Sequence, residues 1–69
     1  MKKTYIARGL IEYQMWLNID GLSLRICFSG GSMSANGVVA ARYTTDNPLI
    51  QHFIEKSQQF ATHRIALLR

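Results

Sequence analysis

Apolar and polar residues alternate along two runs within residues 10–29, on either side of an Asp20-Gly21 pair. An Asp-Gly pair between alternating runs is a strong signal for a type I′ β-turn, because both central residues of that turn take positive φ angles. The resulting antiparallel hairpin would have an apolar face that pairs Tyr13 with Phe28, Met15 with Ile26, Leu17 with Leu24, and Ile19 with Leu22. Its other face would be almost wholly polar, pairing Glu12 with Ser29, Gln14 with Cys27, Trp16 with Arg25, and Asn18 with Ser23. A shift of one residue would turn half of the apolar side chains to water, so the turn and the pattern predict the same register.

The alternation changes phase upstream of this hairpin, near Arg8 and Gly9. Ile6 and Leu10 occupy even positions, whereas the apolar residues of the hairpin's first run occupy odd positions. A glycine within a strand pattern often marks a bulge or a bend. We therefore expect either one long strand bent at Gly9 or two strands that meet at a corner there.

Small and polar residues, apart from Met33, fill residues 30–37, which is typical of a mobile loop. Residues 38–44 then predict a third strand, with Val39, Ala41 and Tyr43 on one face. The alternation in this strand is weak. The pattern leaves open whether both of its faces are buried or whether it lies at an edge of the sheet.

A helix is predicted to begin at residues 45–48, where Asp46 or Asn47 would accept hydrogen bonds from the amides of the first turn. Pro48 suits that turn because its missing N–H has no partner to lose there. An apolar stripe at helical spacing follows, formed by Leu49, Ile50, Phe53 and Ile54. We expect the helix to end near residues 57–59, with Phe60 folded back onto the core, and residues 62–69 to form a fourth strand.

The predicted order of elements is β-β-β-α-β within a single small domain that spans residues 1–69. We expect an α+β fold, a small antiparallel sheet covered by one helix. A domain of this size buries only about 60% of the surface that its unfolded chain exposes, and usually needs a disulfide, a metal or a partner. Cys27 is the only cysteine, and His52 and His63 have no metal-ligand spacing. Oligomerisation or docking on a larger assembly is the remaining means of stabilisation.

Eight Lys and Arg residues against four Asp and Glu residues give a net charge of +4. The sign favours an acidic partner such as nucleic acid, but the basic residues are scattered and include no run of five or more. We favour solubility as the role of this charge. The chain has no apolar segment of the length that a signal peptide or a membrane span requires. With a free cysteine, this predicts a protein made in a reducing, intracellular compartment that is not secreted by a signal peptide and does not bind a membrane.

The residues that could act in catalysis have predicted structural roles or lie in unsuitable surroundings. Asp20 belongs to a turn and Asp46 to a helix cap, while Glu12 and Glu55 fall on exposed faces. The sequence leaves open a pairing of Cys27 with a histidine, because such partners meet only in the fold, but a free thiol is favoured. Residues 30–32, Gly-Gly-Ser, lack the remainder of a phosphate-loop motif. We expect no enzyme activity, no metal, no cofactor and no small-molecule substrate.

Trp16 and Arg25 are the notable pair on the polar face of the predicted hairpin. A cation–π contact between them is one interpretation, and covering of the face by another element is the alternative. Trp and Arg are enriched among the residues that dominate binding energy at interfaces. We predict that Trp16, Arg25 and Arg42 bind a partner.

Residues 43–60, with the sequence YTTDNPLIQHFIEKSQQF, resemble the closing part of small structural proteins carried by tailed bacteriophages and prophages. In these proteins a strand runs into T-x-[DN]-x, a short helix with Ile/Leu-Gln and Ile-Glu, a Phe and a final strand. The resemblance covers roughly the last third of the chain. It implies a structural role in a phage particle, with a location in the virion or the host cytoplasm, and supplies no catalytic residues.

Three hypotheses of function follow. The leading one is a non-enzymatic structural or interaction protein, a small phage virion component that packs in multiple copies on a larger protein assembly. The second is a small basic nucleic-acid-binding module that uses Arg25, Arg42, Lys2 and Lys3. The third is an accessory subunit or inhibitor of an intracellular enzyme.

Overall fold

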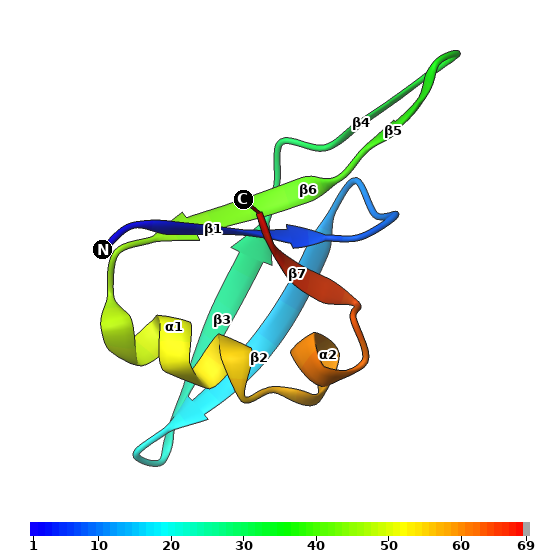
Figure 1. Ribbon diagram of the computed structural model, residues 1–69. Helices are drawn as coiled ribbons and strands as arrows, with labels where there is room; N and C mark the ends of the chain where they lie inside the picture. Colours follow the sequence, from blue (N-terminus) through cyan, green and yellow to red (C-terminus); the bar gives the residue numbers. More distant parts are fainter. Residues whose placement is uncertain (69) are drawn as a thin grey trace.

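The computed structural model describes residues 1–68 and consists of short antiparallel strands with two short helices. The elements in chain order are β1 (Lys3–Ala7), β2 (Tyr13–Ile19), β3 (Leu22–Phe28), β4 (Ser32–Ser34), β5 (Gly37–Val39), β6 (Ala41–Thr45), α1 (Pro48–Glu55), α2 (Gln58–Ala61) and β7 (Ile65–Leu68). They form a three-stranded sheet of order β6-β1-β7 and two separate hairpins, β2-β3 and β4-β5 (Figure 1). The α+β class is therefore seen, but the single sheet and single helix expected from the sequence are wrong.

The hairpin of β2 and β3 has the predicted register from Tyr13 opposite Phe28 to Ile19 opposite Leu22. Its turn residues Asp20 and Gly21 have φ angles of 52° and 80°, as a type I′ turn requires. Local turn chemistry and side-chain alternation were thus sufficient to predict this element.

The change of phase near Gly9 marks a corner between two separate strands. β1 ends at Ala7, whose carbonyl oxygen accepts a 3.1 Å hydrogen bond from the amide of Leu10. Gly9 has a φ of 75°, a conformation that glycine adopts without strain. The turn places β1 in the three-stranded sheet and β2 in its own hairpin, so the alternative of one long bent strand is wrong.

The segment expected to be a mobile loop contains a hairpin, and the expected third strand is two strands. β4 pairs with β5, with Met33 opposite Val38, and β5 ends before Ala40. The amide of Ala41 then donates a 2.7 Å hydrogen bond to the carbonyl oxygen of Leu10, and β6 continues along β1. Because alternation of side chains runs through both strands, the sequence pattern did not reveal the break.

Asn47, one of the two candidate caps, begins α1. Its side-chain oxygen accepts hydrogen bonds from the amides of Leu49 at 2.9 Å and Ile50 at 3.4 Å. α1 ends at Glu55, two residues before the predicted range. Ser57 then begins the unpredicted helix α2, because its hydroxyl donates to the carbonyl of Ile54 at 2.6 Å and accepts from the amide of Phe60 at 3.3 Å.

The final strand is shorter than predicted. His63 has a φ of 64°, outside the range of a strand, and β7 begins at Ile65. Within this strand Ile65 is buried, and Ala66 and Leu67 are half-buried. Arg69, the last residue of the predicted strand, lies outside the described residues.

The core lies between the three-stranded sheet, the hairpin of β2 and β3, and α1. The buried apolar residues come from all of these elements: Tyr5, Ala7, Met15, Leu17, Ile26, Phe28, Ala41, Ile54 and Ile65. Gln51 is buried with them and its side-chain nitrogen donates a 2.9 Å hydrogen bond to the carbonyl oxygen of Thr45. This bond ties α1 to the end of β6.

Candidate functional site

Trp16 and Arg25 lie opposite each other on the outer face of the β2-β3 hairpin, as predicted. The Trp16 side chain is 63% exposed, so no described element covers it. The ring contacts found among residues 1–68 join Tyr5 to Phe60, Tyr13 to Phe28, Phe28 to Tyr43, and His52 to Phe53. Neither interpretation of this face is therefore seen in the described part of the chain: no cation–π contact of Arg25 with Trp16 is found, and no element covers Trp16.

Arg42 is exposed but lies elsewhere. Its backbone exchanges hydrogen bonds of 3.1 Å and 2.8 Å with Ser29, just beyond β3. Ser29 is four residues beyond Arg25, roughly 13 Å along an extended chain. The structure therefore brings two of the three predicted contact residues together and places Arg42 near the base of the β4-β5 hairpin.

An apolar groove lies at the turn end of the β2-β3 hairpin, against the first turn of α1. We call it the tip groove; its volume is about 440 Å³, and it is lined by Ile19, Asp20, Leu22, Ser23, Leu24, Asn47, Leu49 and Ile50. The leucines Leu22 and Leu24, which the pattern assigned to the core, are 74% and 38% exposed. Each strand of the hairpin has seven residues, about 23 Å in length, and the inner face near the turn extends past the elements that would cover it.

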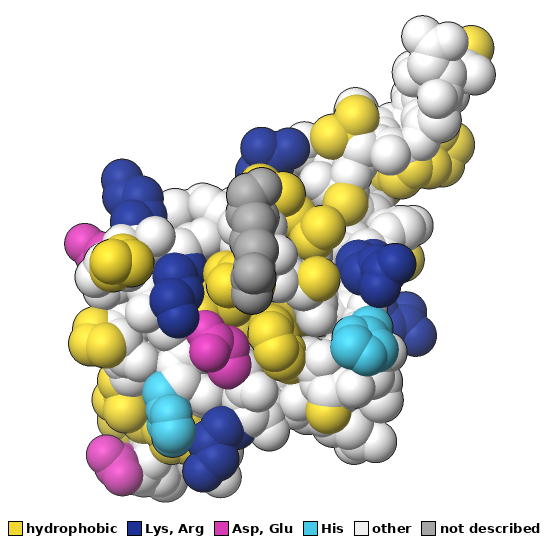
Figure 2. Space-filling model, in the orientation of Figure 1, with side chains coloured by type: hydrophobic (Ala, Val, Ile, Leu, Met, Phe, Trp, Pro, Cys, Tyr) yellow, Lys and Arg dark blue, Asp and Glu magenta, His cyan; other side chains and the backbone are white. Residues whose placement is uncertain are grey.

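The β4-β5 hairpin, which we call the arm, projects from the opposite end of the molecule (Figure 1). All six residues of its strands are exposed. Met33 and Val38 are directly paired and therefore share one face, and they are 71% and 47% exposed. Figure 2 shows apolar side chains along this projection and also at the opposite edge of the same view.

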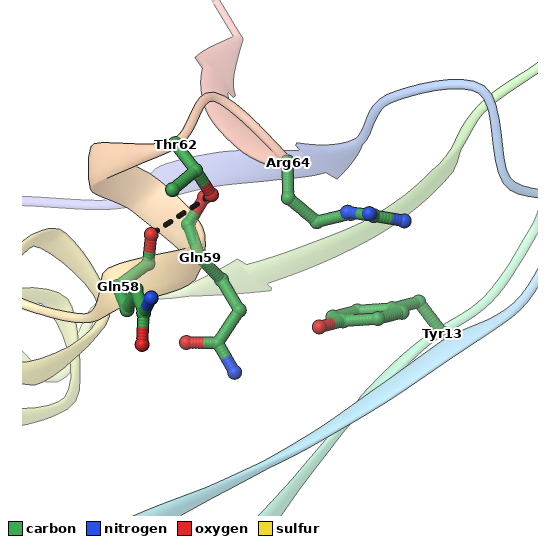
Figure 3. Close-up of a pocket in the computed structure, with 5 residues that line it drawn as sticks. All are labelled: Tyr13, Gln58, Gln59, Thr62 and Arg64. Carbon is green, nitrogen blue, oxygen red and sulfur yellow. Dashed lines mark hydrogen bonds between the residues drawn. The ribbon is translucent and has the colours of Figure 1, made fainter.

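A polar hollow of about 390 Å³ is lined by Tyr13, Gln58, Gln59, Thr62 and Arg64. Arg64 extends over the ring of Tyr13, and the two glutamine amides border the same space (Figure 3). The Thr62 hydroxyl donates a 2.9 Å hydrogen bond to the carbonyl oxygen of Gln58. A ring, a cation and amides suit binding of a planar or anionic group, and the lining has neither a carboxylate nor a thiol.

Glu55 accepts two hydrogen bonds at the edge of the core. The Tyr5 hydroxyl donates to Glu55 Oε2 at 2.5 Å, and Lys3 Nζ donates to the same oxygen at 3.0 Å. These hydrogen bonds, that of Tyr5 first, lower the pKa of the Glu55 carboxyl. Burial, with a smaller contribution from Glu55, raises the pKa of Tyr5. The cluster ties β1 to the end of α1.

The other candidate chemical groups are not gathered into one site. Cys27 is exposed and lies opposite Gln14 on the hairpin. Within residues 1–68, no three His, Cys, Asp or Glu side chains are close enough to hold a metal ion. No helix in the described part of the chain has the length and apolar character needed to cross a membrane.

Sequence reasoning missed the tip groove, the arm and the polar hollow. The apolar face of the predicted hairpin assigned Tyr13, Leu22 and Leu24 to the core. In the structure Tyr13 is only half-buried and lines the polar hollow. The one available signal was Met33, an apolar residue in a small and polar segment.

Comparisons with known proteins give no relative for this chain: no family model matches it, and no curated protein or solved structure shows significant similarity.

Proposed function

We propose that the chain is a non-enzymatic structural and interaction protein, a small phage virion component that packs in multiple copies on a larger protein assembly. The observation that carries this proposal is the pair of exposed apolar surfaces at the two ends of the molecule, the tip groove and the arm. Contiguous exposed apolar surface is typical of protein interaction sites. Trp16 and Arg25 add a further exposed pair of the residue types that dominate binding at interfaces.

The size of the core supports a role within an assembly. Nine apolar residues are buried, while Leu22, Leu49, Met33 and Val38 are each between 47% and 74% exposed. Burying such side chains against a partner would contribute about 25 cal/mol for each Å² removed from water. Association would therefore add to the few kcal/mol that the core of a chain of 69 residues usually supplies.

The virion part of the proposal rests on the resemblance of residues 43–60 to small structural proteins of tailed phages. In this segment Asn47 is a helix cap and Ile54 is fully buried. These roles suit a compact building block whose contacts are made by its surface.

Size-exclusion chromatography with light scattering tests the proposal. We expect the wild-type chain to elute with a mass that rises with concentration above that of one 7.8 kDa chain. Replacing the exposed groove residues, Leu22→Ser with Leu49→Ser, should return the mass to that of one chain. Ile11→Ser, which changes a residue that is 38% exposed and lies outside the groove lining, is the matched control and should still associate. A wild-type chain that stays a monomer at every concentration would count against the proposal.

Nucleic-acid binding is a second candidate, favoured by the polar hollow. Tyr13 would stack on a base, and Arg64 would contact a phosphate, in a chain with a net charge of +4. Arg25, Arg42 and Lys2 are also exposed, but Arg25 lies on the face of the hairpin opposite that of Tyr13. Fluorescence anisotropy with a labelled single strand should then show binding at low salt that weakens steeply as salt is added. Absence of binding at low salt removes this candidate.

A further inference from the structure

The two exposed apolar surfaces differ in shape. The tip groove is concave, and Leu22, Leu24 and Leu49 are among the residues that line it. The arm is a projection with Met33 and Val38 on one face. The arm and the turn of β2-β3 lie at opposite ends of the molecule (Figure 1), whose greatest dimension is 43 Å. The arm therefore does not reach the groove of its own chain.

We propose, resting on the multi-copy function above, that the Met33 and Val38 face of the arm of one copy docks in the tip groove of the next copy. The contact joins two different surfaces and is therefore head-to-tail. Repetition of such a contact generates a ring where the rotation closes and a filament where it does not.

The chemistry of the two surfaces supports the arm of a second copy as the group that binds in the tip groove. Residues 30–40, which include the arm, contain no charged residue, so docking of the arm face removes no arm charge from water. Met is an unbranched side chain that adapts to irregular apolar cavities. The groove lining carries Asp20, and the base of the arm carries the exposed Arg42, so the charges that flank the contact have opposite sign.

The arm also needs a partner for its own stability. Its strands have three residues each, and all of them are exposed. An isolated two-stranded hairpin is marginal in water and is stabilised by packing of one face. Docking in the groove of a second copy supplies that packing.

Disulfide cross-linking between two variants tests the docking. Both carry Cys27→Ser; one adds Val38→Cys on the arm, and the other, which bears an affinity tag, adds Ile19→Cys in the groove, on the same face of the hairpin as Leu22. These positions leave Met33 and the groove leucines in place. Mild oxidation of the mixture should give the mixed dimer in a yield at least about tenfold above that of the controls, because docking raises the effective concentration of the thiols.

Two matched controls place the thiols outside the proposed contact. A chain that keeps the native Cys27 carries its thiol on the polar face of the hairpin, opposite Gln14, away from the groove leucines and outside the groove lining. Ser32→Cys places the arm thiol on the face opposite Val38, because Ser32 pairs with Val39.

Each outcome has one meaning. A mixed Val38→Cys and Ile19→Cys dimer that exceeds both controls supports the docking. Association by light scattering with cross-links only between like variants, or with equal yields in the controls, overturns the arm-in-groove contact and leaves the multi-copy function standing. A monomer at every concentration with no cross-link overturns both.

Discussion

At the residue scale, Tyr5 belongs to the apolar core and also makes a hydrogen bond to a charged side chain. Its side chain is fully buried, yet its hydroxyl donates to the carboxylate of Glu55 at the core's edge. The pattern of the sequence placed Glu55 on an exposed face, and its side chain is 35% exposed. Alternation could not show that Glu55 meets Tyr5, because fifty residues separate the two along the chain.

Tyr5→Phe should lower the free energy of unfolding by roughly 1 to 2 kcal/mol, since it removes a hydrogen bond to a charged acceptor and keeps the buried ring. Chemical denaturation followed by circular dichroism measures the change. Tyr43→Phe, at the half-buried position opposite Tyr5 in β6, is the matched control, because its hydroxyl makes no hydrogen bond within residues 1–68. A Tyr5→Phe variant as stable as the wild type would show that the hydroxyl contributes nothing.

The lowered pKa of Glu55 predicts an acid-sensitive part of the stability. A carboxyl whose pKa is lower in the folded chain stabilises the fold above its unfolded value, here 4.5, and loses that contribution as the pH falls through its folded value. The wild type should therefore lose more stability than Glu55→Gln between about pH 6 and pH 3. Denaturation curves at several pH values measure this, and parallel losses in the two proteins would contradict the assignment.

At the element scale, the success of the prediction depended on how local the signal was. The β2-β3 register and the cap of α1 follow from Asp20-Gly21 and from Asn47, which act within a few residues. The end of β5 at Val39 depends instead on the hydrogen bond of Ala41 to Leu10, a contact distant in sequence. Ser57 was a local signal for the start of α2. The pattern of apolar residues could not reveal this helix, because four residues are too few to show helical spacing.

Gly31 packs closely against the backbone of Ile11, which is distant from it in sequence. A Cβ atom at this position would lie 2.5 Å from the backbone Cα and oxygen of Ile11, which cannot move as a side chain would. Gly31→Ala should therefore destabilise the chain by about 1 to 3 kcal/mol, as overpacking does. Ser32→Ala, at the next and exposed position, should change the stability by less than about 0.5 kcal/mol. Thermal unfolding of the two variants decides this, and equal melting temperatures would contradict the close contact.

At the scale of the whole molecule, the sequence did not predict which apolar side chains are exposed. The apolar face of the hairpin was predicted, but Leu22 and Leu24 are exposed because burial depends on which other elements lie above them. Of the predicted contact residues, Trp16 and Arg25 lie together, whereas Arg42 lies beside the arm. The chain thus exposes apolar surface at each end, at Leu22 and Leu49 and at Met33 and Val38.

The most direct test of the central claim, that this chain packs in multiple copies, is native mass spectrometry of the wild type over a series of concentrations. Packing in multiple copies predicts ions at integer multiples of 7.8 kDa whose share grows with concentration. It also predicts that Leu22→Ser with Leu49→Ser leaves only the single chain. Wild-type spectra that contain only the 7.8 kDa chain throughout the series would contradict it.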